Sequence, residues 1–132
     1  MLTSGPTRRV LVIEDDEVAA ALAQSILEEA GYEVVVAADR QAGLNIATNY
    51  DQIALVVLDV GLPDISGYEV CARIRTDLDS LNLPVLMLTV KSSEQDRFSG
   101  LVLADADAYL TKPADPVNLV ATVEQLIRRR RR

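Results

Sequence analysis

The stretch ALVVLDVGLPD, residues 54–64, decides the fold of this chain. Its five consecutive apolar residues are too few for a helix and predict a strand that is buried on both faces. The run ends on Asp59, and Gly61 and Pro63 then interrupt regular structure. A carboxylate at the tip of a buried strand is costly unless something pairs with it, so Asp59 is either a functional group or, more simply, a loop residue or helix cap.

Composition restricts the class of protein. A chain of 132 residues that is 49 % hydrophobic and 25 % charged fits one globular domain with a substantial core. No apolar run approaches the length of a membrane span, and residues 1–9 lack the apolar core of a signal peptide, so we expect a cytoplasmic protein. The single cysteine, Cys71, agrees with a reducing compartment. The absence of histidine disfavours zinc and leaves room for a hard, oxygen-liganded cation.

The net charge of −7 is unevenly distributed along the chain. Arg128–Arg132 supplies five of the 13 basic residues, so residues 1–127 carry −12, from 8 basic against 20 acidic residues. This acidic body argues against a nucleic-acid-binding core. The five arginines have two interpretations. The simpler is a solvated helix end or the start of a linker, and the other is contact with nucleic acid or another acidic surface.

Apolar runs and helix signals alternate along the chain. Five strands are predicted, at residues 10–13, 33–38, 54–59, 85–89 and 108–110. A helix is expected after each strand. The first begins at Asp16 and Glu17 and ends with a C-cap at Gly31, and the second runs from an N-cap at Asp39 to about Asn49. The third runs from about Ser66 to Asp77, the fourth begins at a cap at Ser92 or Ser93, and the fifth begins at Asp115 and Pro116. The residues expected to face the core in the first, second and last helices are Leu22, Ala23, Ile26, Leu27 and Ala30; Ala42 and Ile46; and Leu119, Val120, Val123 and Ile127.

Five repeats of strand and helix, with strands that are apolar throughout, predict a doubly wound α/β domain. Short connections and right-handed crossovers then give a parallel five-stranded sheet with helices on both faces. The expected organisation is a flexible arm at residues 1–7, the folded domain at residues 8–127 and a basic tail at residues 128–132.

Chemically capable side chains follow four of the five predicted strands. Glu14 and Asp15 end the first, Asp59 the third and Thr89 the fourth, and Lys112 follows the fifth. In the strand order 2-1-3-4-5 these strands bring all of the groups to one rim, where doubly wound sheets bind ligands. Any one of these residues could simply be a helix cap, a turn residue or an exposed lysine. Their recurrence at the ends of four strands favours a functional site.

The chemistry of these groups is coherent. Three crowded carboxylates repel one another, and a divalent cation relieves the repulsion; magnesium suits carboxylates together with a phosphate. A remaining oxygen of Asp59 can attack phosphorus as a nucleophile and give an aspartyl phosphate. Lys112 would neutralise one phosphoryl oxygen, and the Thr89 hydroxyl could donate to another.

Together with Leu62-Pro63-Asp64, Gly67 and Pro113, these residues resemble the receiver domain of bacterial two-component response regulators. The resemblance covers about residues 8–127 and implies a flavodoxin-like (βα)5 fold. It also implies that a histidine kinase phosphohistidine supplies a phosphoryl group to Asp59. Beyond phosphorylation and dephosphorylation of itself, such a domain is not an enzyme.

The resemblance implies roles for single residues. Thr89 would move toward the phosphoryl group and let Tyr109, at the aromatic switch position, turn inward. The peptide bond between Lys112 and Pro113 is cis in similar domains, with an ordinary trans turn as the alternative. The implied ligands of Mg²⁺, or of Mn²⁺ in its place, are Asp15, Asp59, the carbonyl of Gly61 and, through water, Glu14.

The implied partners are a histidine kinase or histidine phosphotransfer protein, and a downstream protein or output domain. The downstream partner would bind the surface formed by the fourth helix, fifth strand and fifth helix, and homodimerisation on phosphorylation is a further hypothesis. In the family this surface is often used for pairing, but here Ala114 replaces a frequent phenylalanine. The segment 100–109 is also one residue longer than usual, with Asp105 where a turn glycine is common. We therefore expect the surface to pair differently or not at all.

Val90 is a second departure, because alanine or glycine usually follows the threonine. A β-branched residue there should crowd the phosphoryl group and the attacking water, so slow phosphorylation and slow self-hydrolysis are expected. A phosphorylation-independent pseudo-receiver that acts as a protein-interaction module is the main alternative. A magnesium-dependent phosphatase of the haloacid dehalogenase type would need a second acid two residues beyond Asp59, where this chain has Gly61.

Overall fold

The computed structural model describes residues 8–49, 53–59, 83–89, 107–112 and 114–130. The expected arm at residues 1–7, the third and fourth helices, Gly61, Val90 and the peptide bond to Pro113 lie outside these residues. None of the helices in the described part is long and apolar enough to cross a membrane.

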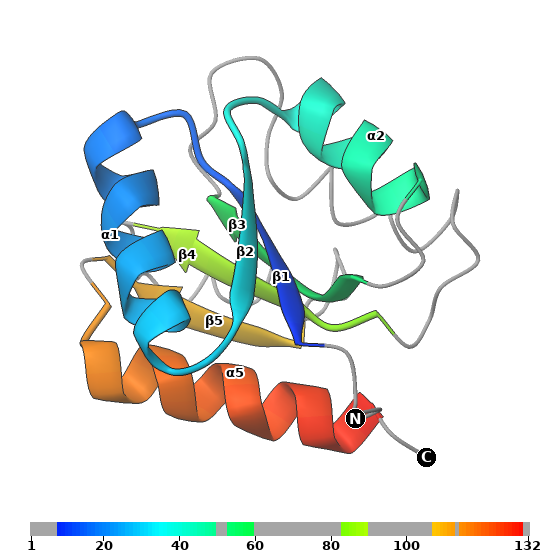
Figure 1. The fold of residues 1–132 in the computed structure, drawn as a ribbon. Helices are drawn as coiled ribbons and strands as arrows, with labels where there is room; N and C mark the ends of the chain where they lie inside the picture. The colour runs from blue at the N-terminus through cyan, green and yellow to red at the C-terminus, as the bar shows by residue number, and fades with distance from the viewer. Residues whose placement is uncertain (1–7, 50–52, 60–82, 90–106, 113, 131–132) are drawn as a thin grey trace.

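Five parallel strands form one sheet in the order β2-β1-β3-β4-β5 (Figure 1). The predicted parallel sheet and its strand order are therefore confirmed. Each strand lies within one residue of its predicted bounds. The strands are β1 (Arg9–Ile13), β2 (Glu33–Ala37), β3 (Ile53–Asp59), β4 (Val85–Thr89) and β5 (Ala108–Thr111).

The central strand β3 is buried along its whole length. Val56 and Leu58 pack on one face of the sheet with residues of α2 (Arg40–Asn49). Leu55 and Val57 pack on the other face with residues of α1 (Glu17–Glu29) and α5 (Pro116–Arg130) (Figure 1). Helices thus cover both faces, which explains why the strand is apolar at every position before Asp59.

Aspartates begin all three described helices, because a carboxylate oxygen can accept a backbone N–H that has no partner within the helix. Asp16 Oδ1 accepts from Val18 N–H at 3.2 Å, and Asp39 Oδ1 accepts from Ala42 N–H at 2.9 Å. At α5, Asp115 Oδ2 accepts from the N–H of Asn118 at 3.1 Å. The predicted caps at Asp39 and Asp115 are confirmed.

Two details predicted for α1 were wrong. Leu22 is 53 % exposed instead of facing the core. The buried line of α1 is Ala20, Ala23 and Leu27, and Leu22 lies about 100° around the helix from Ala23. The C-cap is Ala30, and Gly31 follows it with a φ of 99°. Gly31 N–H donates to Glu28 O and Tyr32 N–H to Leu27 O, so the glycine supplies the left-handed residue of a Schellman motif.

Gly43 in α2 lets the helix approach β1 closely. A Cβ added to Gly43 would overlap Cδ1 of Ile13 and lie 2.7 Å from its Cγ1. Ile13 is fully buried and β-branched, so it has little freedom to move away. The packing of α2 on the sheet therefore requires glycine at this position.

We expect Gly43→Ala to destabilise the fold by about 1–3 kcal/mol through overpacking, although alanine favours a helix by about 1 kcal/mol. Urea unfolding measures the change. Adding Ile13→Val removes the overlapping methyl group and should recover part of the loss. Unchanged stability of Gly43→Ala would contradict the close approach.

Candidate functional site

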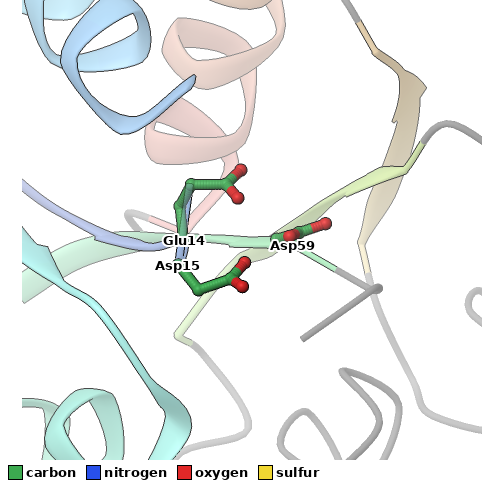
Figure 2. A group of neighbouring side chains, drawn as sticks. All are labelled: Glu14, Asp15 and Asp59. Atoms are coloured by element: carbon green, nitrogen blue, oxygen red, sulfur yellow. The ribbon is translucent and has the colours of Figure 1, made fainter. Parts of the chain in front are cut away.

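Three carboxylates meet at the carboxyl ends of β1 and β3. Ile13 pairs with Leu58 in the sheet, so the next residues, Glu14 and Asp59, are neighbours. One oxygen from each of Glu14, Asp15 and Asp59 lies within 4.8 Å of the others, as Figure 2 shows. Glu14 and Asp59 are only 5 % and 7 % exposed, whereas Asp15 is open to solvent.

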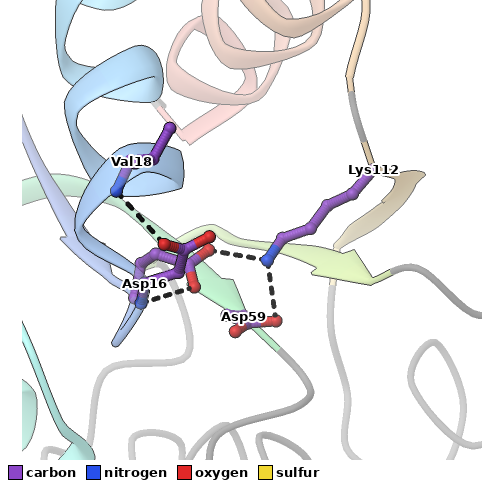
Figure 3. A network of polar contacts seen from close by, with 5 residues as sticks. Asp16, Val18, Asp59 and Lys112 are labelled. Carbon is purple, nitrogen blue, oxygen red and sulfur yellow. Dashed lines mark hydrogen bonds and ion pairs between the residues drawn. The ribbon is translucent and has the colours of Figure 1, made fainter.

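The turn from β1 into α1 fixes the position of Glu14. Its backbone N–H donates to Ala37 O at 2.9 Å, which extends the contact between β1 and β2 by one residue. Its side-chain Oε2 accepts from the N–H of Asp16 at 3.3 Å, and Asp16 in turn caps α1 (Figure 3). The carboxylate is thus held by the same backbone that starts the helix.

Lys112 supplies the positive charge of the site. Its Nζ lies 2.8 Å from Glu14 Oε1 and 3.4 Å from Asp59 Oδ1 (Figure 3). The lysine follows β5, and β4 separates that strand from β3, so the long side chain reaches across the carboxyl end of β4. One ammonium group therefore bridges two buried carboxylates and offsets part of the cost of removing them from water.

Burial and the neighbouring charges shift the pKa values of two groups at this site. Burial raises the pKa of Glu14 above 4.5; the hydrogen bond from Lys112 opposes the rise, and nearby Asp59 adds to it. Burial lowers the pKa of Lys112, but its contacts with Glu14 and Asp59 outweigh that effect and raise the pKa overall. Lys112 thus stays charged between the two buried carboxylates, and Asp15 adds a third acid to the described part of the site.

The structure places the other predicted residues in different ways. Thr89 ends β4 one position beyond Leu88, which pairs with Asp59, and Thr89 itself pairs with Thr111. Its backbone therefore lies at the same edge of the sheet, and its side chain is outside the description. Tyr109 is half-buried in β5 and packs with the core cluster on the α2 face.

A cleft of about 210 Å³ opens beside the site, between α1 and α5. Lys112, Glu14 and Asp16 form its polar part, and the rest of the lining is apolar: Ala19, Leu22, Ala23, Ile26, Leu88, Ala114 and Leu119. Sequence reasoning missed this cleft because it assigned Leu22 to the core. The available signal was the group of small residues, three alanines, that leave space between the two helices.

Comparisons with known proteins agree with this geometry. Residues 10–124 match the family described as the response regulator receiver domain. The chain is 41 % identical over 122 residues to the alkaline phosphatase synthesis transcriptional regulatory protein PhoP of Bacillus subtilis, with 92 % of this chain and 49 % of the relative covered. It is 41 % identical over 121 residues to the DNA-binding dual master transcriptional regulator RpaA of Synechocystis, with the same shares covered.

Solved structures show the same fold. A CheY-like response regulator receiver domain protein from Methanospirillum hungatei superposes with a TM-score of 0.84 at 28 % identity, covering 93 % of this chain and 95 % of that one. The receiver domain of the Francisella response regulator 1452 also has a TM-score of 0.84, at 29 % identity, covering 92 % and 98 %.

The chain belongs to the response regulator receiver domain family, a family of signalling domains. It spans about half the length of the curated relatives that it matches. The family resemblance seen in the sequence and the flavodoxin-like fold are both confirmed.

Crowding of the acids predicts that Asp59→Asn stabilises the metal-free protein. The substitution removes one of two buried negative charges and leaves the ion pair between Lys112 and Glu14 intact. We expect the free energy of unfolding in a chelator at pH 7 to rise by about 1 kcal/mol. Asp39→Asn is the matched control, since it removes an exposed acid and asparagine caps a helix equally well. A lower melting temperature for Asp59→Asn would contradict the crowding.

The difference in stability between Asp59→Asn and wild type should depend on pH, and the direction follows from the pKa of Glu14. A carboxyl group whose pKa is raised on folding contributes stability that is complete below its unfolded pKa, here 4.5, and is lost as pH rises through the folded pKa. Asp59 is one cause of the raised pKa of Glu14. The advantage of Asp59→Asn over wild type should therefore be larger at pH 7 than at pH 4.5. An advantage that shrinks toward pH 7 would contradict this coupling.

Proposed function

We propose that this chain receives a phosphoryl group on Asp59 from the phosphohistidine of a histidine kinase or histidine phosphotransfer protein, in two-component signalling. The observation that carries the proposal is the position of Asp59. Its buried carboxylate ends the central strand beside two further acids and the Lys112 ammonium group. This arrangement combines a nucleophile with a group that can neutralise a phosphate oxygen.

The donor set fits Mg²⁺, with Mn²⁺ as a substitute. Three carboxylates within 4.8 Å of one another are hard oxygen ligands with excess negative charge. Asp15 and Asp59 would bind the ion directly, with the carbonyl of Gly61, and Glu14 would contribute through water. When bound, such a cation neutralises charge on the phosphoryl oxygens and on the carboxylates.

The transfer moves one phosphoryl group between two protein atoms. An oxygen of Asp59 forms the new bond to phosphorus while the bond to the donor imidazole nitrogen breaks, and that nitrogen keeps the electron pair. Lys112 carries a positive charge already directed at Asp59, and it would turn to a phosphoryl oxygen as the carboxylate becomes an acyl phosphate. The Thr89 hydroxyl would donate to a second phosphoryl oxygen, and Tyr109 would then turn inward.

Phosphorylation would change which protein or output domain this chain binds. Curated relatives are named as transcriptional regulators, so we propose that the switch controls a transcriptional output in the cytoplasm, through a downstream protein or output domain. The fourth helix, β5 and α5 would form the responding surface, with a homodimer as one arrangement. The only covalent chemistry proposed is phosphorylation and dephosphorylation of Asp59 itself.

Intact mass measurement after incubation with a small phosphodonor and Mg²⁺ tests the phosphoacceptor. We expect one added phosphoryl group in wild type and none in Asp59→Asn or in a chelator. An adduct that persists in Asp59→Asn would assign the phosphate elsewhere. No adduct under any condition would favour the pseudo-receiver, in which partners bind without phosphate.

Val90→Ala tests the steric effect of the residue after Thr89. We expect both phosphorylation and hydrolysis of the aspartyl phosphate to accelerate, by up to about tenfold, which corresponds to about 1.4 kcal/mol of crowding. Val36→Ala, at an exposed position in β2, is the control and should leave both rates unchanged. Equal rates in Val90→Ala and wild type would refute the steric effect.

The cleft beside Glu14 and Lys112 suggests how a protein donor approaches. Val18 and Val117, in the first turns of α1 and α5, are 76 % and 74 % exposed, and Leu22 lines the cleft. An apolar cleft that opens beside a polar site can hold an apolar side chain of a partner protein. We propose that an apolar side chain of the donor protein enters the cleft.

Leu22→Ser should therefore slow phosphoryl transfer from a histidine kinase by about tenfold or more, in line with the loss of an apolar contact of about 1.4 kcal/mol. The rate with a small phosphodonor should not change, because that molecule needs no docking surface. Val36→Ser is the matched control on β2. Equal loss with both donors would show damage to the site instead of to docking.

A further inference from the structure

The cleft between α1 and α5 has the size of a site for a small molecule. Its volume is about 210 Å³. An engineered protein cavity of about 150 Å³ with an apolar lining binds benzene. The cleft therefore has room for one aromatic ring that carries a short chain.

Small side chains keep this space open. Ala19, Ala23 and Ile26 are three or four residues apart, so they lie on one side of α1, and all three line the cleft. Ala114, just before α5, lines it as well. A large side chain at position 114 would occupy the space, so the open cleft depends on alanine there. The apolar walls suit the apolar body of a ligand.

The polar part of the cleft can accept a hydrogen bond from a ligand. Lys112 Nζ lies 2.8 Å from Glu14 Oε1, so these two charges are already paired. Asp16 is exposed, and within the described residues its carboxylate accepts only from Val18 N–H, through Oδ1 at 3.2 Å (Figure 3). A carboxylate has about four acceptor positions, so Asp16 can accept from a further donor.

The described charges around the cleft favour a positively charged ligand. Two acids, Glu14 and Asp16, line it, and Lys112 is the one base among the described lining residues. Glu17 lies in the first turn of α1, and Asp115 caps α5. These acids offset the positive ends of the two helix dipoles, so the helix starts do not repel a cation.

We propose that the cleft binds a small primary amine whose apolar body is about the size of one aromatic ring. The ring lies among the apolar side chains, and the ammonium group donates to the Asp16 carboxylate. A ligand with a carboxylate fits less well, because it meets Asp16 and because Lys112 is already paired with Glu14. The amine fills the space assigned above to a side chain of the donor protein. Competition between the two rests on the proposed function, whereas binding of the amine does not.

An NMR titration of the backbone amides with 2-phenylethylamine, at low salt in a chelator at pH 7, tests the proposal on the intact chain. For a ligand of about nine non-hydrogen atoms we expect a Kd of about 1–10 mM. The amide signals of Ala19, Ala23 and Leu119, which line the cleft, should shift. The matched acid 3-phenylpropionate should bind at least about fivefold more weakly, because its charge is reversed. This comparison needs no variant.

Two variants separate the charge from the space. Asp16→Asn removes the charge but keeps a helix cap, so the preference for the amine over the acid should largely disappear. Its control is Glu29→Gln, which removes an exposed acid at the other end of α1. Ala114→Phe fills the cleft and should weaken binding of the amine at least tenfold. Its control is Val36→Phe, which adds a ring at an exposed position of β2.

Several outcomes would overturn the proposal. They are no shift of the cleft amides at about 20 mM amine, above the expected Kd, equal binding of the amine and the acid, and unchanged binding in Ala114→Phe. An equal loss of preference in Asp16→Asn and Glu29→Gln would reveal only a net-charge effect. Thermal melting of each variant verifies folding. Phosphorylation by a small phosphodonor does not use the cleft, so its failure and the failure of amine binding are distinguishable.

Discussion

One ammonium group between two buried carboxylates is the interaction on which the site depends. Glu14 and Asp59 end neighbouring parallel strands and are both removed from water, so neither could be tolerated there with its full charge uncompensated. Lys112, which follows β5, supplies the compensating positive charge across the end of β4. The sheet must therefore be parallel, and its order must place β1, β3 and β5 so that these three residues meet at one edge.

Acids outnumber bases among the described side chains of this site. Asp15 adds a third acid, and the raised pKa of Glu14 reflects burial and the nearby charge of Asp59. Three hard oxygen ligands so close together are compatible with a bound divalent cation. The same arrangement explains why α1 begins where it does, since Asp16 both caps the helix and donates its N–H to Glu14.

Different groups occupy the two edges of the sheet. The carboxylates and the cleft between α1 and α5 lie at the carboxyl ends of the strands. At the amino ends, the guanidinium of Arg8 lies over the ring of Tyr32, and Arg9 pairs with Glu33. The amino-end contacts join the segment before β1 to the start of β2, whereas the carboxyl edge gathers the groups of the candidate site.

Much of the fold was predictable from local signals. Apolar runs without alternation identified strands covered on both faces, and Asp39 and Asp115 marked helix starts because their carboxylates can bond free N–H groups. The prediction failed where neighbouring elements decide burial. Leu22 continued an apolar stripe in the sequence, but α5 leaves space beside it, so it lines a cleft.

The sequence by itself determined the family, the order of strands and helices, and which chemical groups stand at strand ends, because these depend on residue type and on spacing along the chain. Only the tertiary structure decided that Lys112 lies closer to Glu14 than to Asp59, that a cleft opens beside Glu14 and Lys112, and that the guanidinium of Arg8 lies over the ring of Tyr32. These contacts join segments far apart in the sequence. They follow from strand order, side-chain reach and burial, none of which is encoded in any one stretch of residues.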